Sequence, residues 1–262
     1  MASTTLVREC VRRISVALQD TDPQFTTFAE RDIIDALNDG QRLLALYIPQ
    51  CAARLDALKL VPGAMQSIDA IAASRLLPAD GSTPPATVRG KQILNPVCMM
   101  GSDGATPGKQ VRMSDNKYMA ALSPAWMTQY GEPREVFYDP MQPRIFWVNK
   151  PVPLSGNYWM LLSYIADPAV IPNTGTEASP LYGHSGTNTT TIGVDDLVLD
   201  DLVNYVVARM KTTDPKSVAS SEASGFVSIF TGGLNSKAQA MTGMNPNLKR
   251  LPMTPGAAQA AA

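Results

Sequence analysis

The sequence contains few of the residues that most often carry chemistry. It has one histidine, His184, and three cysteines, Cys10, Cys51 and Cys98, which lie far apart and form no C-x-x-C pair. Closely spaced cysteines and histidines are the usual sign of a zinc site, and an even set of cysteines is the usual sign of a disulfide framework. The sequence therefore predicts three small buried thiols in a reducing cytosol, with neither a metal site nor a disulfide framework.

Charge is also scarce, and its two signs balance. Charged residues make up 17% of the chain, and 22 lysines and arginines against 23 aspartates and glutamates leave a formal net charge of -1. A protein that holds DNA through its phosphates normally has an excess of basic residues, so strong DNA binding is not expected. An uncharged surface is better suited to contacts between subunits.

Long apolar runs are absent as well. The most apolar stretch, residues 158–171, is interrupted by Asp167 and Pro168. It is shorter than the roughly 20 residues of a membrane-spanning helix. Arginines interrupt the N-terminal apolar residues, which argues against a signal peptide. The sequence predicts no contact with a membrane.

No arrangement of residues predicts catalysis or a cofactor. His184 and Ser185 are adjacent in the chain, and adjacent residues do not place an imidazole to deprotonate the neighbouring hydroxyl. Four aspartates between residues 195 and 201 are more typical of a capped, solvated helix face than of a metal site. The turn at 104–109 lacks the spacing of a phosphate-binding loop. We therefore expect no enzyme, no cofactor and no metal.

Aromatic residues gather in the middle of the chain. Nine lie between residues 126 and 164: Trp126, Tyr130, Phe137, Tyr138, Phe146, Trp147, Tyr158, Trp159 and Tyr164. Such a cluster could stack on sugars or on single-stranded nucleic acid. Most of its members fall within predicted strands and point to both faces, which favours a sandwich core with a covered interface.

The N-terminal 50 residues are predicted to form two helices. Apolar residues recur at helical spacing from Leu6 to Leu18. A second helix is expected after Thr27, which would form a capping box with Glu30, and it would continue to Pro49. Gly40 inside this helix would permit a close helix contact or a bend.

The middle of the chain is predicted to form short antiparallel strands separated by Pro/Gly turns. The expected strands are 57–61, 92–94, 109–113, 135–138, 145–148 and 158–165, with a brief helix at 116–122. Strands this short, joined in this way, are typical of a meander or a small sandwich. Residues 80–85 and 172–193 are predicted to be loops, the second one mobile in the free chain.

Helices are predicted again near the C-terminus. One would run from Asp195 to Lys211 and another from Asp214 to Gly232-Gly233, and the two would pair as an αα-hairpin. After Gly233 the chain has no acidic or aromatic residue and three prolines, so it is expected to be an extended tail that cannot fold alone.

Together these observations predict an α+β protein. A helical bundle formed by N- and C-terminal helices would hold a central antiparallel β insertion, either a sandwich or a meander, and an extended tail would follow. The predicted divisions are residues 1–50 for the first helices, 51–170 for the β-rich insertion, 171–193 for a flexible loop, 194–232 for the αα-hairpin, and 233–262 for the tail.

Six short motifs occur in an order that is similar to a known family. They are Ile33 to Pro49, Leu58-Lys-Leu60 with Pro62-Gly63-Ala-Met-Gln66, Gly101 to Gly108, Pro124-Ala-Trp126, Tyr138-Asp139-Pro140 through Phe146-Trp-Val148, and Leu202 to Arg209 closing on Asp214. From about Phe28 to Phe230 the chain resembles the head-to-tail adaptor proteins of tailed bacteriophages, especially the short-tailed kind.

The resemblance implies a structural virion protein and no enzyme. It implies a homo-oligomer, a twelve-subunit ring beneath the portal, that joins the portal vertex of the capsid to the tail and continues the DNA channel. Portal protein and a tail nozzle or tube protein would be its partners, and packaged DNA would pass without sequence-specific binding. Such a protein would be assembled in the host cytoplasm and would reside in the virion neck.

Two alternatives remain open from the sequence. One is a tail or receptor-binding module with an aromatic carbohydrate platform, and the other is a small hydrolase centred on His184 and Ser185. If the chain is an adaptor, its tail is expected to bind the portal through the only anchors that this segment offers. Leu234, Met241, Met244, Leu248, Leu251 and Met253 would enter apolar grooves between portal subunits, and Lys249 and Arg250 would meet acidic groups.

Overall fold

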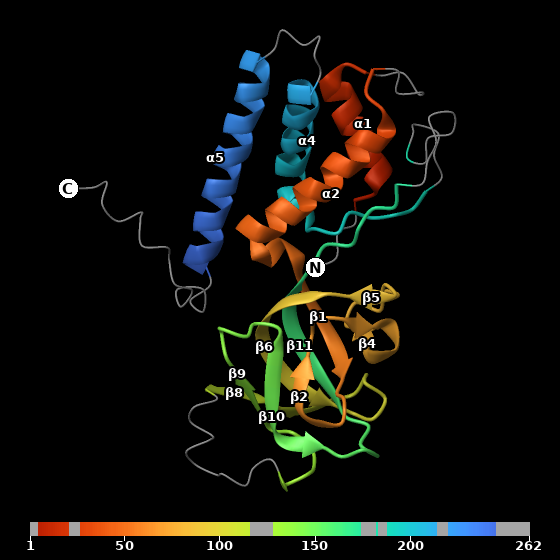
Figure 1. The fold of residues 1–262 in the computed structure, drawn as a ribbon, viewed down its shortest axis with the longest axis vertical. Helices are drawn as coiled ribbons and strands as arrows, with labels where there is room; N and C mark the ends of the chain where they lie inside the picture. Colours follow the sequence, from red (N-terminus) through yellow and green to blue (C-terminus); the bar gives the residue numbers. More distant parts are fainter. Residues whose placement is uncertain are drawn as a thin grey trace, which may run out of the picture.

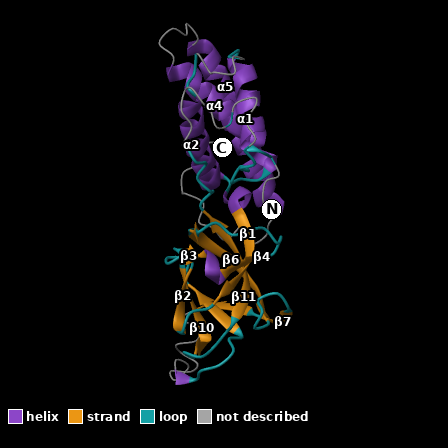
Figure 2. Ribbon diagram, turned by 90° about the vertical axis from the view of Figure 1, so that its right-hand side faces the viewer, coloured by secondary structure: helices purple, strands orange, loops and turns teal. Residues whose placement is uncertain are grey.

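The computed structural model describes residues 5–20, 27–115, 128–173, 182, 188–213 and 220–244. These residues form a helical lobe and a β lobe, stacked along the long axis of the molecule (Figure 1, Figure 2). The helical lobe contains α1 (Val7–Leu18), α2 (Glu30–Tyr47), α4 (Leu199–Thr213) and α5 (Ser220–Met244). The β lobe is inserted between α2 and α4. The predicted α+β class, with a bundle built from both ends of the chain, is confirmed.

The first helix follows the predicted apolar stripe. The side chains of Val7, Cys10, Val11 and Ile14 are buried on one face of α1, while Arg12 lies on the exposed face. The helix ends where Gln19 adopts a left-handed conformation with φ of 61°. Burial of this single stripe against α2 and α4, rather than capping at its N-terminus, holds α1 in place.

The predicted capping box at the start of α2 is wrong. The helix begins at Glu30, and its N-cap residue is Ala29, which has no side chain able to cap. The backbone N–H groups of Thr27 and Phe28 instead donate to the Asp20 carboxylate at 3.1 and 2.9 Å. The Glu30 carboxylate accepts from the Tyr182 backbone N–H at 2.6 Å. The Thr27 N–H therefore binds Asp20 in place of Glu30, and the Glu30 carboxylate binds the backbone of Tyr182.

Gly40 brings α2 close to α4, as the sequence predicted. A Cβ atom at this position would lie 2.7 Å from the Leu202 side chain and 2.8 Å from the Tyr205 ring. Such distances are too short for any side chain, so only glycine allows the two helices to approach this closely. The contact places α4 in the centre of the lobe, between α2 and α5 (Figure 1).

The β lobe is a sandwich of two sheets with a small two-stranded sheet beside them. Its strands are β1 (Ala53–Lys59), β2 (Gly63–Ser67), β3 (Ile71–Ala72), β4 (Leu76–Pro78), β5 (Thr87–Val88), β6 (Gly90–Met100), β7 (Pro107–Gln110), β8 (Arg112–Asp115), β9 (Glu135–Tyr138), β10 (Ile145–Val152) and β11 (Trp159–Ala166). The five-stranded sheet has the order β4-β1-β11-β6-β7 and the four-stranded sheet the order β2-β10-β9-β8. β3 pairs with β5.

The strand predictions hold in outline and differ in detail. The expected strand at 135–138 is β9, while those at 57–61, 92–94, 145–148 and 158–165 are shifted or are parts of longer strands. Strands β2 to β5 were not predicted. The single strand expected at 109–113 is two strands, β7 and β8, which belong to different sheets. β8 pairs with β9 in parallel, so the lobe is not wholly antiparallel. The helix expected at 116–122 lies outside the described residues.

A buried polar cluster is enclosed between the sheets. The Tyr164 hydroxyl donates to the Asp56 carboxylate at 2.6 Å, and Arg54 Nε donates to the same oxygen at 2.9 Å. On the other sheet, the fully buried Gln66 amide bonds the backbone N–H and C=O of Val61, both at 2.8 Å. Tyr164 and Arg54 thus satisfy the Asp56 carboxylate, and the backbone satisfies the Gln66 amide, so these groups are paired within a largely apolar core.

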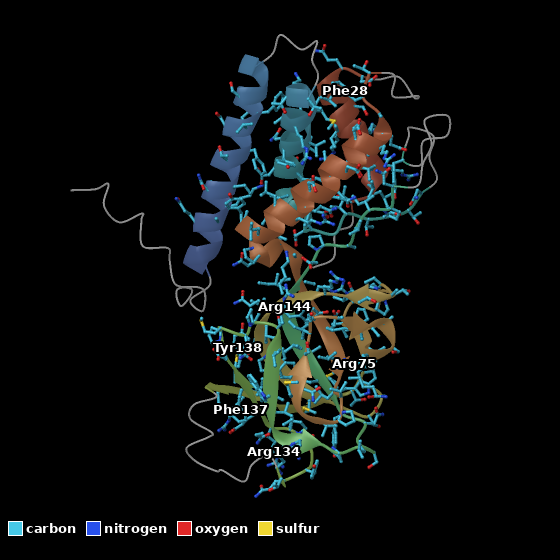
Figure 3. The ribbon with its side chains drawn as sticks, in the orientation of Figure 1. Phe28, Arg75, Arg134, Phe137, Tyr138 and Arg144 are labelled. Carbon is cyan, nitrogen blue, oxygen red and sulfur yellow. The ribbon has the colours of Figure 1, made fainter. Side chains whose placement is uncertain are left out.

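Side chains also fasten the edges of the β lobe. Arg75 binds the Lys59 carbonyl oxygen with Nε at 3.1 Å and Nη2 at 3.0 Å, which ties the turn after β3 to the end of β1. Arg144 and Arg134 mark the two ends of the β9–β10 hairpin, with Arg144 nearer the helical lobe (Figure 3). Arg144 pairs with Asp69 at 2.9 Å.

The two lobes meet where β1 begins and β11 ends. Ala53 and Ile165 are directly paired in the antiparallel register. Ala45 of α2, Ala52 and Ile165 form a small apolar cluster at this junction. The Asp195 backbone N–H donates to the Cys51 carbonyl oxygen at 2.9 Å and holds the return of the chain to the helical lobe.

Candidate assembly surface

The last helix is longer than the sequence predicted. A helix end at Gly232-Gly233 was expected, but α5 continues through both glycines to Met244. Its buried residues Phe230 and Leu234 lie one turn apart and join the core of the helical lobe. The prediction of an extended segment from residue 233 is therefore wrong for residues 233–244. The other proposed divisions of the chain stay predictions.

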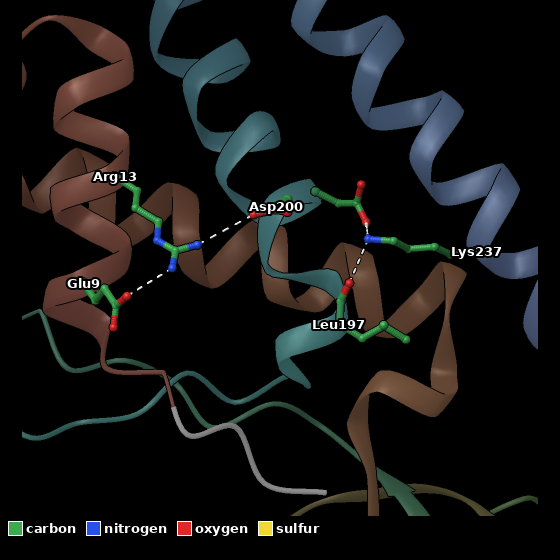
Figure 4. A network of polar contacts seen from close by, with 6 residues as sticks. Glu9, Arg13, Leu197, Asp200 and Lys237 are labelled. Carbon is green, nitrogen blue, oxygen red and sulfur yellow. Dashed lines mark hydrogen bonds and ion pairs between the residues drawn. The ribbon is translucent and has the colours of Figure 1, made fainter.

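A close contact and an ion pair fix α5 against α4. The Asp201 carboxylate lies directly against Gly233, in the space that a Cβ would occupy. Lys237, one turn further along α5, donates to Asp201 Oδ2 at 2.6 Å and to the Leu197 carbonyl oxygen at 2.7 Å (Figure 4). The Asp201 side chain is almost completely buried, so this pair is shielded from solvent on one side.

Aromatic contacts continue the packing of α5 on α4. The rings of Tyr205 and Phe230 are 5.3 Å apart between centroids and tilted by 48°. The Lys211 ammonium lies 5.2 Å from the centroid of the Phe226 ring. These contacts all lie on one side of α5, and the side chains of Val227 and Ile229 on the remainder of the helix are exposed.

On its other side, α4 is tied to α1. Arg13 binds Glu9 of its own helix at 3.0 Å and Asp200 of α4 at 3.7 Å (Figure 4). Asp195 accepts the Leu197 backbone N–H at 2.9 Å and caps the turn that precedes α4. The sequence assigned these aspartates to a solvated, capped helix face. That interpretation is wrong for the buried Asp201, whose partner lies 36 residues away.

The predicted portal-binding residues fall into three groups. Leu234 is buried in the core of this chain, so its side chain is already used by α5 and cannot also fill a groove of a partner. Met241 and Met244 belong to the last turns of α5, and their side chains lie outside the described part of the chain. The remaining five, Leu248, Lys249, Arg250, Leu251 and Met253, also lie outside the described residues.

The described residues of the loop at 171–193 are anchored to the helical lobe. Asn38 makes two hydrogen bonds with the backbone of Ile171, at 3.1 and 2.8 Å. The Tyr182 side chain is buried, and its hydroxyl donates to the Pro172 carbonyl oxygen at 3.2 Å. Near the far end, the Gly193 N–H donates to Gln41 at 2.6 Å. Mobility in the free chain stays a prediction, and these contacts show where the loop is held.

The aromatic residues that the structure describes are used mainly in packing. Phe137, Phe146, Trp159 and Tyr164 are buried, whereas Tyr130 is exposed. The predicted sandwich core is therefore confirmed for Phe146 and Tyr164. Phe137 and Trp159 lie on the outer faces of the sheets and are nevertheless buried, so these four residues do not form an open stacking platform. Trp126 lies outside the described residues.

The proposed alternative centred on His184 and Ser185 falls on residues that the structure does not describe. Within the described ranges, no group of three or more histidine, cysteine, aspartate or glutamate residues is placed to hold a metal ion. Among those same residues, no helix is both long and apolar enough to cross a membrane.

The three cysteines differ in their surroundings. Cys10 on α1 and Cys51 near the lobe junction are buried, and burial raises the pKa of each thiol to about 12. Cys98 lies on β6 and is partly exposed, so the prediction of three buried thiols is wrong for this residue. Because the thiolate is the reactive form, Cys98 is the best placed of the three to react with reagents in solution.

Comparison with known proteins gives one family. The family model described as SU10 adaptor protein matches residues 5–250, which include all the described helices and strands of both lobes. A search of curated proteins finds no match.

Proposed function

The chain belongs to the SU10 adaptor protein family, a family of phage head-to-tail adaptors, and from this membership we propose that twelve copies form a ring between the portal vertex and the tail. The family is structural and not enzymatic. An adaptor links the head to the tail, so the portal and a tail protein are its partners in general terms. In the proposal, the ring also continues the channel through which DNA passes.

The family match over nearly the whole chain is the observation that carries this proposal. The elongated shape supports it, because two lobes stacked end to end give each subunit one pole for the head and another for the tail (Figure 2). The near-neutral charge of -1 also supports a channel wall. A wall with few cationic contacts releases few counterions from DNA and therefore guides the duplex without holding it.

For the portal contact we propose the segment that follows Met244. This segment contains Leu248, Leu251 and Met253 as apolar anchors, and Lys249 and Arg250 as cations for acidic groups. It directly follows α5, which is fixed to the body through Phe230, Leu234 and Lys237. A fixed helix would place each copy of the segment at the same point around a ring, and repeated weak contacts would then add by avidity.

Electron microscopy of the chain mixed with portal tests the ring. Twelve-fold rings seated on portal are expected, and a chain that never assembles on portal would overturn the proposal. Deletion of residues 245–262 tests the tail separately. Because the deletion leaves α5 intact, helical content and thermal unfolding should be almost unchanged, while stable attachment to portal should be lost.

A matched control separates loss of the anchors from loss of length. Replacing Leu248, Leu251 and Met253 together by serine keeps the length and the cations of the segment. This variant should bind portal about as poorly as the deletion, because apolar anchors dominate such contacts. Full binding by both variants would show that another surface attaches the ring.

A further inference from the structure

The two outer faces of the β sandwich each carry an apolar row with exposed side chains, and they point in opposite directions. Strands β1, β4, β7 and β11 of the five-stranded sheet lie on one side of the lobe, and β2 and β10 of the four-stranded sheet lie on the other (Figure 2). Neither face points toward the helical lobe, which is stacked along the long axis. Both faces are therefore directed sideways from that axis.

The outer face of the five-stranded sheet can be read from the strand register. Residues directly opposite each other in an antiparallel pair share a face. One row across β4, β1, β11 and β6 consists of Leu77, Ala57, Leu161 and Cys98. The next row, across β1, β11, β6 and β7, consists of Lys59, Trp159, Met100 and Pro107. Lys59 is the only charged residue in these rows, and its ammonium lies 5.8 Å from the Trp159 ring centroid. Ala57 and Trp159 are buried, whereas Leu77 is exposed.

Strand β11 shows that this face is unusual for a solvated sheet. Antiparallel strands with one face in water normally alternate apolar and polar residues. The sequence of β11, Trp-Met-Leu-Leu-Ser-Tyr-Ile-Ala, contains only one residue, Ser163, that is not apolar. Such a continuous run is typical of a strand that is covered on both faces. Met160, Leu162 and Tyr164 are covered by the opposite sheet, whereas Leu161 on the outer face is only partly buried.

The outer face of the four-stranded sheet has the same character. One row across β2, β10, β9 and β8 consists of Met65, Trp147, Phe137 and Ser114. This row contains no charged side chain, but Phe137 within it is fully buried. The neighbouring row on the same face contains Arg112 and Glu135, which are directly paired, and the Arg144–Asp69 ion pair lies where β10 begins. The side chain of Met65 is 57% exposed, as are 43% of Leu55 and 40% of Leu77 on the other sheet.

We infer that these two faces are the contact surfaces between neighbouring copies of the chain, with the five-stranded sheet of one subunit packed on the four-stranded sheet of the next. This inference rests on the proposed ring. A ring needs a heterologous interface, which joins two different patches on opposite sides of each subunit. The sandwich supplies such a pair, because Leu55 and Leu77 are exposed on one face and Met65 is exposed on the other. A portal or tail partner would be reached at one pole of the long axis, whereas both faces flank that axis.

Cross-linking through the native Cys98 tests this contact. Cys98 lies on the five-stranded face, and a Met65→Cys substitution adds a thiol to the four-stranded face. Packed sheets are separated by about 10 Å, which a short bismaleimide can span. In rings assembled on portal, this variant should give a ladder of covalent multimers in a denaturing gel. Cys10 and Cys51 are buried and should not contribute.

Two control variants define the result. Adding Cys98→Ser to Met65→Cys should abolish the ladder. A Leu154→Cys variant places a thiol at an even more exposed position, in the turn after β10 and away from both faces, and it should give no ladder. Cross-linking of the Met65→Cys chain to portal or to a tail protein in place of itself would overturn the inference.

Charge substitutions provide an independent test. Met65→Asp and Leu77→Asp should each reduce the fraction of portals that carry a complete ring by about tenfold or more, because each would bury an unpaired carboxylate. Leu46→Asp, at an exposed position on α2, should leave ring formation unchanged. Circular dichroism shows whether each variant is folded. If wild-type rings form but folded Met65→Asp and Leu77→Asp rings form equally well, the inference fails and the adaptor function stands.

Discussion

Gly233 of α5 and Asp201 of α4 are in direct contact, and the Asp201 carboxylate fills the space that a Cβ atom at position 233 would need. Lys237 binds the same carboxylate at 2.6 Å. The glycine thus allows α5 to approach close enough for its own lysine to neutralise a buried acid. In the sequence, Gly232-Gly233 predicts the end of a helix. In the folded chain, Gly233 is instead the point where α5 packs against α4.

Alanine substitutions at the two adjacent glycines should have opposite effects on stability. Gly233→Ala would place its methyl group on Asp201, and overpacking of this kind destabilises by about 1–3 kcal/mol. Gly232 has nothing within 4 Å of its Cβ position. Gly232→Ala should therefore stabilise α5 by up to about 1 kcal/mol, since alanine is the better helix former. Urea denaturation of both variants measures the difference, and equal effects would contradict the packing described.

Removal of the Tyr164 hydroxyl should destabilise the β lobe. In Tyr164→Phe the Asp56 carboxylate loses a buried 2.6 Å hydrogen bond and retains Arg54. Hydrogen bonds to charged groups contribute about 1.5–3 kcal/mol. The free energy of unfolding should decrease by an amount in this range. Tyr158→Phe, at a partly buried position in the same lobe, is the matched control and should have a smaller effect.

Stability should decrease in alkaline solution. Burial, followed by the negative charge of Asp56, raises the pKa of Tyr164, and burial raises the pKa values of Cys10 and Cys51 to about 12. Raised folded-state pKa values mean that the folded protein keeps these protons longer than the unfolded chain does. Their contribution is complete below the unfolded pKa values. It is lost as pH rises above about 9 for the two thiols and above about 10 for Tyr164, by roughly 1.4 kcal/mol per pH unit for each group. Denaturation curves from pH 8 to 11 measure this slope, which should be smaller in Tyr164→Phe.

The three thiols should react at different rates. Cys98 should be labelled by a thiol reagent at pH 8 in the native protein, while Cys10 and Cys51 should react only when the protein unfolds. Mass spectrometry of the labelled chain identifies the sites. Rapid labelling of Cys10 would show that α1 detaches readily from the helical lobe.

Local patterns predicted much of the fold because they report burial along a single element. The apolar face of α1 and the strand at 135–138 are examples, since the spacing of apolar residues within each segment was enough to predict it. The α2 start could not be predicted in this way, because Glu30 is bound by Tyr182, 152 residues away. The helix end at Gly232-Gly233 was wrong for a related reason, because contacts with α4 outweigh the low helix propensity of glycine.

The candidate assembly surfaces were only partly visible in the sequence. The apolar run of β11 signals a strand covered on both faces, but the rows that cross four strands depend on register, which no single strand specifies. The parallel pairing of β8 with β9 likewise depends on the path of the chain between them. For Leu234, a position in the tail suggested an anchor for a partner, whereas its helical spacing from Phe230 explains its place in the core.

The direct pairing of Ala53 with Ile165 bears on the order in which the chain folds. Helices α2 and α4 must find each other across an intervening segment of well over a hundred residues, and closing so long a loop is entropically costly before any helix contact forms. Once the β lobe has formed, its first and last strands hold Ala53 and Ile165 side by side, so only residues 167–198 remain to connect β11 with α4. The loop that must close is then much shorter, and we expect the inserted lobe to form first and to act as a template for the bundle.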